Sequence, residues 1–134
     1  MQDNNSLAHV INCVKEFHEA FKIKNNEKPT IDVDANTVML RYKLMREENE
    51  EYLEAAQNGD LVEVADALGD MLYILCGTIL SHGMQHKILD VFEEIQRSNM
   101  SKLNANGEPI YREDGKVLKS ELYFKPDIQS VLGE

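Results

Sequence analysis

Residues 61–81 read LVEVADALGDMLYILCGTILS, and this stretch decides the fold class. It is apolar on nearly every side over Met71–Leu80, as in a helix that is buried at the centre of a helical domain or shared with a partner subunit. The longest uninterrupted apolar run, Met71–Cys76, is too short to cross a membrane, and Asp66 and Asp70 lie just before it. The stretch therefore predicts the central helix of an all-α fold with no membrane span.

Helical periodicity continues on both sides of this stretch. Apolar residues recur at steps of three and four before and after it, which is the spacing of amphipathic helices. Asn58-Gly59 supplies a helix stop, and Asp60 supplies an N-cap for the central helix. Three further helices are therefore predicted, over Leu7–Phe21, from Asp34 or Thr37 to Ala56, and from about Gln85 to Lys102.

The chain changes character after residue 107. Ile110–Lys119 contains two short strand-like runs on either side of Asp114-Gly115, which predicts a small β-hairpin. Pro126 then introduces a tail that could fold back or stay loose. We expect one domain over residues 1–134, a four-to-five-helix bundle with a helical core at about 7–103 and a hairpin and tail at about 107–134.

The net charge of −10 is unevenly distributed along the 134 residues. Residues 47–86 hold nine acidic residues and no Lys or Arg, whereas the segments before and after them are close to balanced. A strongly acidic protein repels DNA, RNA and anionic lipid, so we expect no nucleic acid polymer and no membrane as partner. An acidic block confined to 40 residues requires a specific explanation.

The N-terminus and the cysteines indicate the compartment. Met1–Leu7 is polar and has no apolar segment after a basic start, so no signal peptide is predicted. Cys13 and Cys76 both fall within apolar helical patterns and are expected to be buried thiols in a reducing environment. We expect a cytoplasmic protein.

Carboxylates gather on one side of the helix that ends near Ala56. Glu47 and Glu48 share a side of that helix with Glu51, at spacings of four and three residues. A solvated acidic face would show the same pattern.

The next helix favours a different explanation. Glu63, Asp66 and Asp70 fall within about 60° of one another on the helical wheel, among mostly apolar neighbours. Partly desolvated carboxylates are costly unless a cation compensates them. Salt bridges to Arg41, Lys43 or Arg46 could neutralise only some of the six acids.

Oxygen ligands from two facing helices suit Mg²⁺ or Mn²⁺, whereas two other metal centres are excluded by composition. A di-iron carboxylate site needs Glu-x-x-His on two helices, which the segments lack, and a zinc-thiolate site needs more than the two separate cysteines. We therefore expect a divalent metal site for Mg²⁺, with Mn²⁺ as the alternative.

These residues resemble a known family. Leu44-x-x-Glu47-Glu48-x-x-Glu51, followed by acids that end in Asp70-Met71-Leu72-Tyr73, is similar to the pattern of the all-α nucleoside triphosphate pyrophosphohydrolases. This MazG-like superfamily includes phosphoribosyl-ATP pyrophosphohydrolase and the dimeric dUTPases. The resemblance covers roughly residues 14–102, and the segments 97–102 and 111–116 resemble a phosphoribosyl-ATP-pyrophosphohydrolase-like branch.

The resemblance implies a MazG-like bundle that hydrolyses a nucleotide between its α and β phosphates, releasing a monophosphate and pyrophosphate. It implies Glu48, Glu51 and Asp70 as metal ligands, and Glu47 as a ligand or as the general base. The family's pattern is Glu-x-x-Asp on the second helix, but Ala67 stands three residues before Asp70. Asp66 or Glu63 is expected to substitute for the missing glutamate.

Basic and polar residues near the end of the fourth helix are candidates for substrate binding. Asn99 and Lys102 are expected to contact sugar or phosphate, with Arg97 and Lys116 as weaker candidates; a cation at a helix C-terminus would also be explained by the helix dipole. Phe17, His18 and Phe21 could form a wall against the base or belong to the core.

The apolar surface of the third and fourth helices predicts a homodimer or homotetramer. The alternative to an enzyme is a non-catalytic helical oligomer whose acidic face binds a structural metal or a basic partner.

Overall fold

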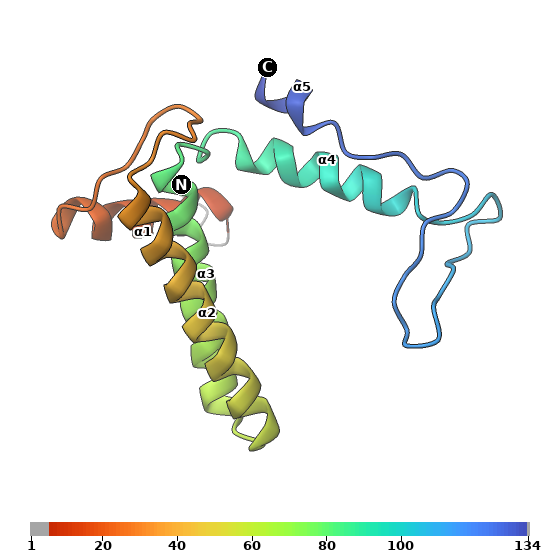
Figure 1. The fold of residues 1–134 in the computed structure, drawn as a ribbon, viewed down its shortest axis with the longest axis horizontal. Helices are drawn as coiled ribbons and strands as arrows, with labels where there is room; N and C mark the ends of the chain where they lie inside the picture. Colours follow the sequence, from red (N-terminus) through yellow and green to blue (C-terminus); the bar gives the residue numbers. More distant parts are fainter. Residues whose placement is uncertain (1–5, 134) are drawn as a thin grey trace. The chain divides into compact units, whose positions relative to one another are not determined.

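A computed structural model describes residues 6–133 and confirms the all-α fold. Five helices are present in this part of the chain, and they carry the labels of Figure 1. Their bounds are α1 Leu7–Ala20, α2 Ala35–Gln57, α3 Leu61–Ser81, α4 Ile88–Met100 and α5 Ile128–Leu132. The ends of the predicted domain, residues 1–5 and Glu134, lie outside the described residues.

The described chain forms two compact units. The first ends at Gln85 and contains α1, α2 and α3, and the second begins at His86 and contains α4 and α5. Each unit is described by itself below. The prediction of a single domain over 1–134 stays a prediction.

Side-chain caps explain why three helices begin where they do. Ser6 accepts a hydrogen bond from the backbone N–H of His9 at 3.1 Å, and Asp60 accepts one from the N–H of Glu63 at 3.1 Å. Asp34 caps α2 in the same way. Each cap satisfies an N–H group that the first helical turn leaves without a partner. These local signals confirm the predicted helix starts, and the predicted bounds of α3 are those observed.

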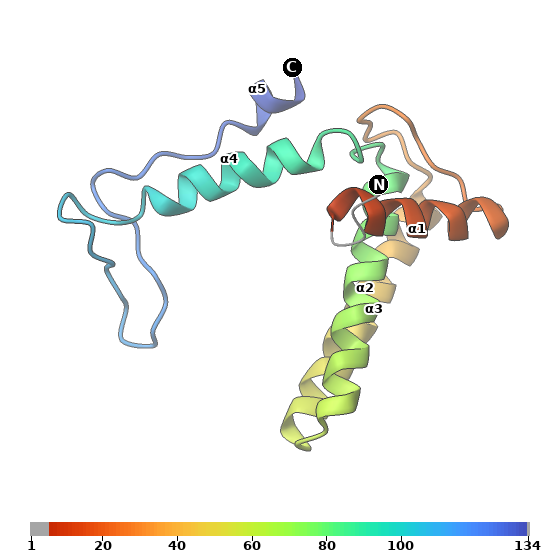
Figure 2. The same cartoon turned by 180° about the vertical axis from the view of Figure 1, so that it is seen from behind.

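Helices α2 and α3 form an antiparallel pair and lie side by side in both views of the fold (Figures 1 and 2). Gly59 makes the reversal with a φ of +67°, a left-handed conformation that favours glycine. Ala55 of α2 and Ala67 of α3 are both buried. Small side chains let the two helices approach closely, which places the acidic faces of both helices next to one groove.

Helix α1 packs against α3 to form the core of the first unit. The core contains Val14 and His18 from α1 and Cys76 and Leu80 from α3, each at most 2% exposed. The expectation that both cysteines are buried is wrong for Cys13, which is exposed on α1. Helical periodicity alone did not show which flank of α1 faces α3.

Hydrogen bonds hold the loop between α1 and α2 against the C-terminal end of α3. The Asn26 side chain donates to the Ser81 carbonyl at 2.7 Å, and His82 Nδ1 donates to the Thr30 carbonyl at 3.0 Å. Gln85 donates to the Asn26 carbonyl at 2.8 Å, so residues after α3 are held by the loop rather than by a new helix. This explains why α4 begins at Ile88 and not near Gln85 as predicted.

The second unit corrects the hairpin prediction. A turn at Asp114-Gly115 is present, but the described residues form no regular strands there. An isolated antiparallel bridge pairs Tyr111 with Val117, and two backbone hydrogen bonds join Arg112 to Lys116 and Leu118 to Ile110. The tail beyond Pro126 folds back as the short helix α5, which contacts α4. A two-stranded ribbon has too little apolar surface to be stable alone.

An exposed apolar face runs along α3. Leu61, Ala65, Leu68, Leu72 and Leu75 recur at alternating steps of four and three, and the four leucines are 44 to 79% exposed. We call these five residues the leucine seam. This spacing is that of helices which pack against further helices. By length and composition alone α3 could also cross a membrane, but the core helix of a helical bundle passes the same test.

Candidate metal centre

Glu48 lies at the centre of the carboxylate cluster between α2 and α3. It projects from the α2 stripe that faces α3, seven residues before the buried Ala55 and seven after Arg41. Glu48 is half-buried, whereas Glu51, Asp66 and Asp70 around it are exposed. One glutamate is thus held against the helix interface while three other carboxylates approach it from the solvent side.

The surroundings of Glu48 oppose its ionisation. Burial raises its pKa to about 7, and a hydrogen bond to Glu51 and the charges of Glu51, Asp70 and Asp66 act in the same direction. Its Oε2 atom is buried and has no hydrogen-bond partner in the described residues. A carboxylate oxygen in this position lacks a positive partner, which a bound cation would provide.

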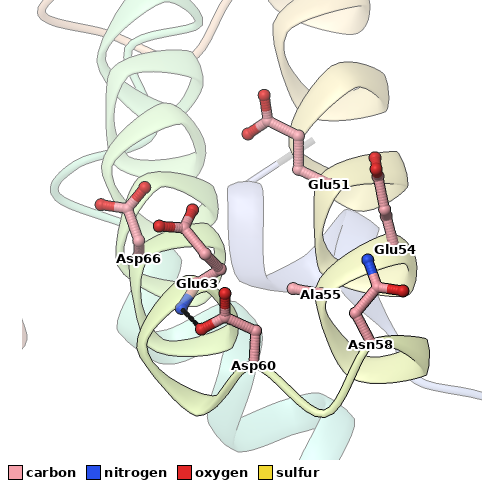
Figure 3. Close-up of a pocket in the computed structure, with 7 residues that line it drawn as sticks. All are labelled: Glu51, Glu54, Ala55, Asn58, Asp60, Glu63 and Asp66. Carbon is pink, nitrogen blue, oxygen red and sulfur yellow. Dashed lines mark hydrogen bonds between the residues drawn. The ribbon is translucent and has the colours of Figure 1, made fainter.

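An acidic groove of about 440 Å³ extends from this cluster toward the α2–α3 turn (Figure 3). Figure 3 shows Glu51 reaching from α2 toward α3, with Glu63 and Asp66 side by side on α3. Asp60 is occupied as the cap of α3, since it accepts from the Glu63 N–H. The groove is lined by Glu51, Glu54, Ala55, Asn58, Asp60, Glu63 and Asp66.

The donor set fits a hard divalent cation, because all its ligands are carboxylate oxygens and one of them is buried without a partner. Within residues 6–133, however, no three His, Cys, Asp or Glu side chains are close enough together to hold an ion as they stand. The side chains of Glu51, Asp66 and Asp70 are exposed, so rotation of their side chains can bring their oxygens toward Glu48.

The two candidates for the missing glutamate lie on the same side of α3. Ala67 is 2% exposed, so the position itself lies in the packed helix interface. Burial raises the pKa of Glu48, and the charge of Asp66 acts in the same direction. Asp66 and Glu63 both line the groove with Glu51. The substitution by Asp66 or Glu63 stays a prediction, and Glu47 is exposed on α2 next to Glu48.

The basic residues of α2 do not neutralise this cluster. Arg46 pairs with Glu50 at 3.2 Å, away from the groove. Arg41 donates to Thr78 Oγ1 at 3.1 Å and to the Ile74 carbonyl at 2.9 Å, and no carboxylate pairs with it among the described residues. Burial lowers the pKa of Arg41. The sequence suggests Arg41 only as a possible salt-bridge partner of the acids. Its spacing of seven residues from Glu48 also places it on the stripe of α2 that faces α3.

The predicted substrate residues are distributed over both units. His18 is 2% exposed, and its Nδ1 donates to Asn25 at 2.6 Å, which favours the core interpretation over contact with a base. Arg97, Asn99, Lys102 and Lys116 all belong to the second unit. Arg97 pairs with Glu94 at 2.9 Å and lies over the Phe124 ring at 4.4 Å, so its guanidinium already has partners. Contact between these four residues and substrate stays a prediction.

Comparison with known proteins identifies the family. The model of the family described as phosphoribosyl-ATP pyrophosphohydrolase matches residues 14–99, which include α2, α3 and all the carboxylates discussed above. The chain belongs to this family. Phosphoribosyl-ATP pyrophosphohydrolases are all-α, MazG-like proteins that typically depend on a divalent metal.

One relative of this family member comes from a giant virus. The uncharacterized protein L479 of Acanthamoeba polyphaga mimivirus is 30% identical over 108 residues, which cover 77% of this chain. The chain spans 42% of the length of that relative. The relative's name assigns no activity, so the similarity adds nothing about substrate.

Proposed function

We propose that this protein is a metal-dependent pyrophosphohydrolase that cleaves a ribonucleoside or deoxyribonucleoside triphosphate, or a related nucleotide, between the α and β phosphates. The single observation that carries the proposal is the buried, partnerless Oε2 of Glu48 within a cluster of four carboxylates. Membership of a pyrophosphohydrolase family supports the reaction class. The products are a nucleoside monophosphate and pyrophosphate.

The chain's own carboxylates have distinct tasks in this proposal. Glu48, Glu51 and Asp70 would hold the cation, with Asp66 and Glu63 beside them. Bound Mg²⁺ or Mn²⁺ would neutralise phosphate charge and lower the pKa of a water. Glu47 is exposed beside this set and is available to orient the attacking water or to accept its proton.

Binding of the phosphates needs positive groups, and the described residues that line the groove include no Lys or Arg. We propose Asn99 and Lys102 as contacts to sugar or phosphate, with Arg97 and Lys116 as further candidates. A nucleotide substrate also supports a cytoplasmic location, with neither a membrane nor a nucleic acid polymer as partner. A panel of nucleoside triphosphates, with pyrophosphate and phosphate detected separately, tests both the activity and the bond cleaved.

A non-catalytic helical oligomer is the second candidate, and the exposed leucine seam is as compatible with it as with an oligomeric enzyme. In this case the acidic groove would bind a structural metal or a basic partner. The two candidates differ in one respect. Only the enzyme releases pyrophosphate in a manner that depends on Asp70.

We expect metal binding to depend on pH through Glu48. With a pKa of about 7, metal-free Glu48 is protonated and neutral below pH 7 and ionised above it. A cation must displace that proton, so Mn²⁺ affinity should rise by up to about tenfold per pH unit below 7 and level off above it. Calorimetry between pH 6 and 8 measures this, and Glu48→Gln should remove the dependence. An affinity that does not change over this range would contradict the assignment.

We propose that the protein is a homodimer or homotetramer in which the leucine seam is buried between copies. Exposed leucines at heptad spacing on a helix favour burial against other helices. Sedimentation at micromolar concentration should give a mass of two or four chains, and Leu68→Glu combined with Leu72→Glu should shift it to one. Lys119→Glu, a charge change in the second unit, serves as the control. A wild-type monomer would refute the proposal.

A further inference from the structure

The acidic side of α3 continues beyond the carboxylates. Glu63, Asp66, Asp70, Tyr73 and Gly77 recur at alternating steps of three and four, so they form one stripe along the helix. Tyr73 follows Asp70 by one turn, about 5 Å along the helix axis at 1.5 Å per residue, and Gly77 follows Tyr73 by a further turn. The aromatic residue therefore adjoins the carboxylate end of the stripe.

Three aromatic rings gather at Tyr73. The Phe17 ring meets the Tyr73 ring edge-on with centroids 5.6 Å apart, and the Phe21 ring lies 4.4 Å from that of Phe17. We call Phe17, Phe21 and Tyr73 the aromatic cluster. Phe17 thus contacts both other rings. Phe17 is 39%, Phe21 67% and Tyr73 40% exposed, so each ring retains accessible surface. Ring faces left in water are available for a flat apolar partner.

The polar groups near the aromatic cluster come mainly from α1. Burial raises the pKa of Tyr73, and Cys13 and Glu16 of α1 act in the same direction. His18 is buried next to Phe17 on α1, and its Nδ1 already donates to Asn25. Arg41 and His18 both lie above Gly77, where an added Cβ would stand 2.5 Å from the Arg41 guanidinium and 2.9 Å from His18 Nε2. These two side chains fill the end of the stripe and close it. A ligand on the cluster therefore meets ring faces, with the Glu16 carboxylate as the charged group beside Tyr73.

Charge determines the direction in which a nucleotide would lie. The carboxylate end of the stripe attracts the cation and, through it, phosphates, whereas the apolar cluster offers nothing to a phosphate. A nucleotide has one anionic end and one flat aromatic end, and the carboxylates and Tyr73 follow one another along the stripe in that order. A second copy of the chain could also cover aromatic rings, but it would not explain why Tyr73 continues the stripe of carboxylates on α3.

We propose that the aromatic cluster is the site on which the base of the nucleotide stacks. The inference rests on the proposed function, since the phosphate end defines the other end of the ligand. Stacking uses the face that every base has, so recognition tolerates different bases. The four common ribonucleoside triphosphates should accordingly differ by no more than about tenfold in apparent affinity.

The first test measures binding without chemistry. Adenosine monophosphate with Mg²⁺ is titrated into the protein and followed by NMR, where contacts between base protons and the Tyr73 ring are expected. Tyr73→Leu and Phe21→Leu should each weaken binding by about 5- to 100-fold, whereas Tyr73→Phe should bind as the wild type does. Tyr42→Leu makes the same change at an exposed tyrosine of α2, outside the aromatic cluster, and should have no effect on binding.

The second test separates this inference from the proposed function. Pyrophosphate release is compared for adenosine triphosphate and for ribose 5-triphosphate, which has no base. If the wild type hydrolyses both and Tyr73→Leu slows only the nucleotide, the stacking site is supported. If Tyr73→Leu slows both equally, the stacking site is overturned while the pyrophosphohydrolase stands. If neither compound is hydrolysed but adenosine monophosphate binds at Tyr73, the activity fails and the base site stands.

Two further outcomes would overturn the inference. Wild-type protein that shows no contact between millimolar adenosine monophosphate and Tyr73 has no base site there. A change of oligomeric mass in Phe21→Leu or Tyr73→Leu, with nucleotide binding unchanged, would make the aromatic cluster a contact between subunits.

Discussion

Replacing Glu51 with glutamine, or Asp70 with asparagine, is expected to lower pyrophosphate release by at least about 100-fold and to leave the helical fold intact. Both residues are exposed next to the half-buried Glu48, so neither amide disturbs the packing of α2 against α3. Each change removes one negative charge from the cluster and with it part of the attraction for a cation. Release is measured with excess Mg²⁺ or Mn²⁺, and circular dichroism monitors the fold.

Glu50→Gln is the matched control for these variants. Glu50 lies on the same helix and pairs with Arg46 on the surface away from the groove, so its loss should leave activity within about twofold, as for other exposed ion pairs. Full activity in Glu51→Gln or Asp70→Asn would refute the metal assignment. Equal losses in Glu50→Gln and Asp70→Asn would show that net charge, rather than position, is responsible.

Gly83→Ala is expected to have the largest effect on stability, about 2–5 kcal/mol. Gly83 has a φ of +66°, where a side chain is disfavoured, and an added Cβ would collide with the backbone carbonyl of Lys28. Backbone cannot move aside as a flexible side chain can. The loop between α1 and α2 would have to separate from the end of α3, with loss of the bond from Asn26 to Ser81.

Gly59→Ala isolates the conformational part of that cost. Gly59 has nearly the same φ, +67°, but nothing lies within 4 Å of an added Cβ. It should lose only about 1–2 kcal/mol, the penalty for the left-handed conformation. Urea unfolding of both variants gives the difference, and equal losses would show that contact with Lys28 contributes nothing.

Most helices could be predicted because the signals for them are local. Asp60 caps the start of α3 and Gly83 follows its end, and the apolar period between them is complete within the helix itself, so the predicted and observed bounds agree. The start of α4 was placed too early because Gln85 is held by Asn26, a residue far away in the sequence. The hairpin prediction was wrong for a related reason. The turn at Gly115 forms locally, but extended strands need a surface to pack against.

The candidate site, too, could be predicted from the sequence only where it depends on neighbouring turns of one helix. Spacing along one helix placed Glu48 with Glu51 and Asp66 with Asp70, because helical geometry alone determines which residues share a side. Spacing could not decide between Asp66 and Glu63, since that depends on how α2 and α3 are aligned along each other. It also could not show that His18 is buried while Phe17, its neighbour, stays exposed.

The sequence by itself determined that this protein is all-α, where its helices α2 and α3 run, and that each carries an acidic side. These properties depend on residues a few positions apart. Only the tertiary structure decided that Oε2 of Glu48 is buried without a partner, that Arg41 reaches the backbone of α3 instead of the acids, and that Tyr73 contacts Phe17 of α1. Burial, pairing and ring contacts arise between helices. The apolar periodicity of a helix does not determine how that helix is rotated against its neighbour.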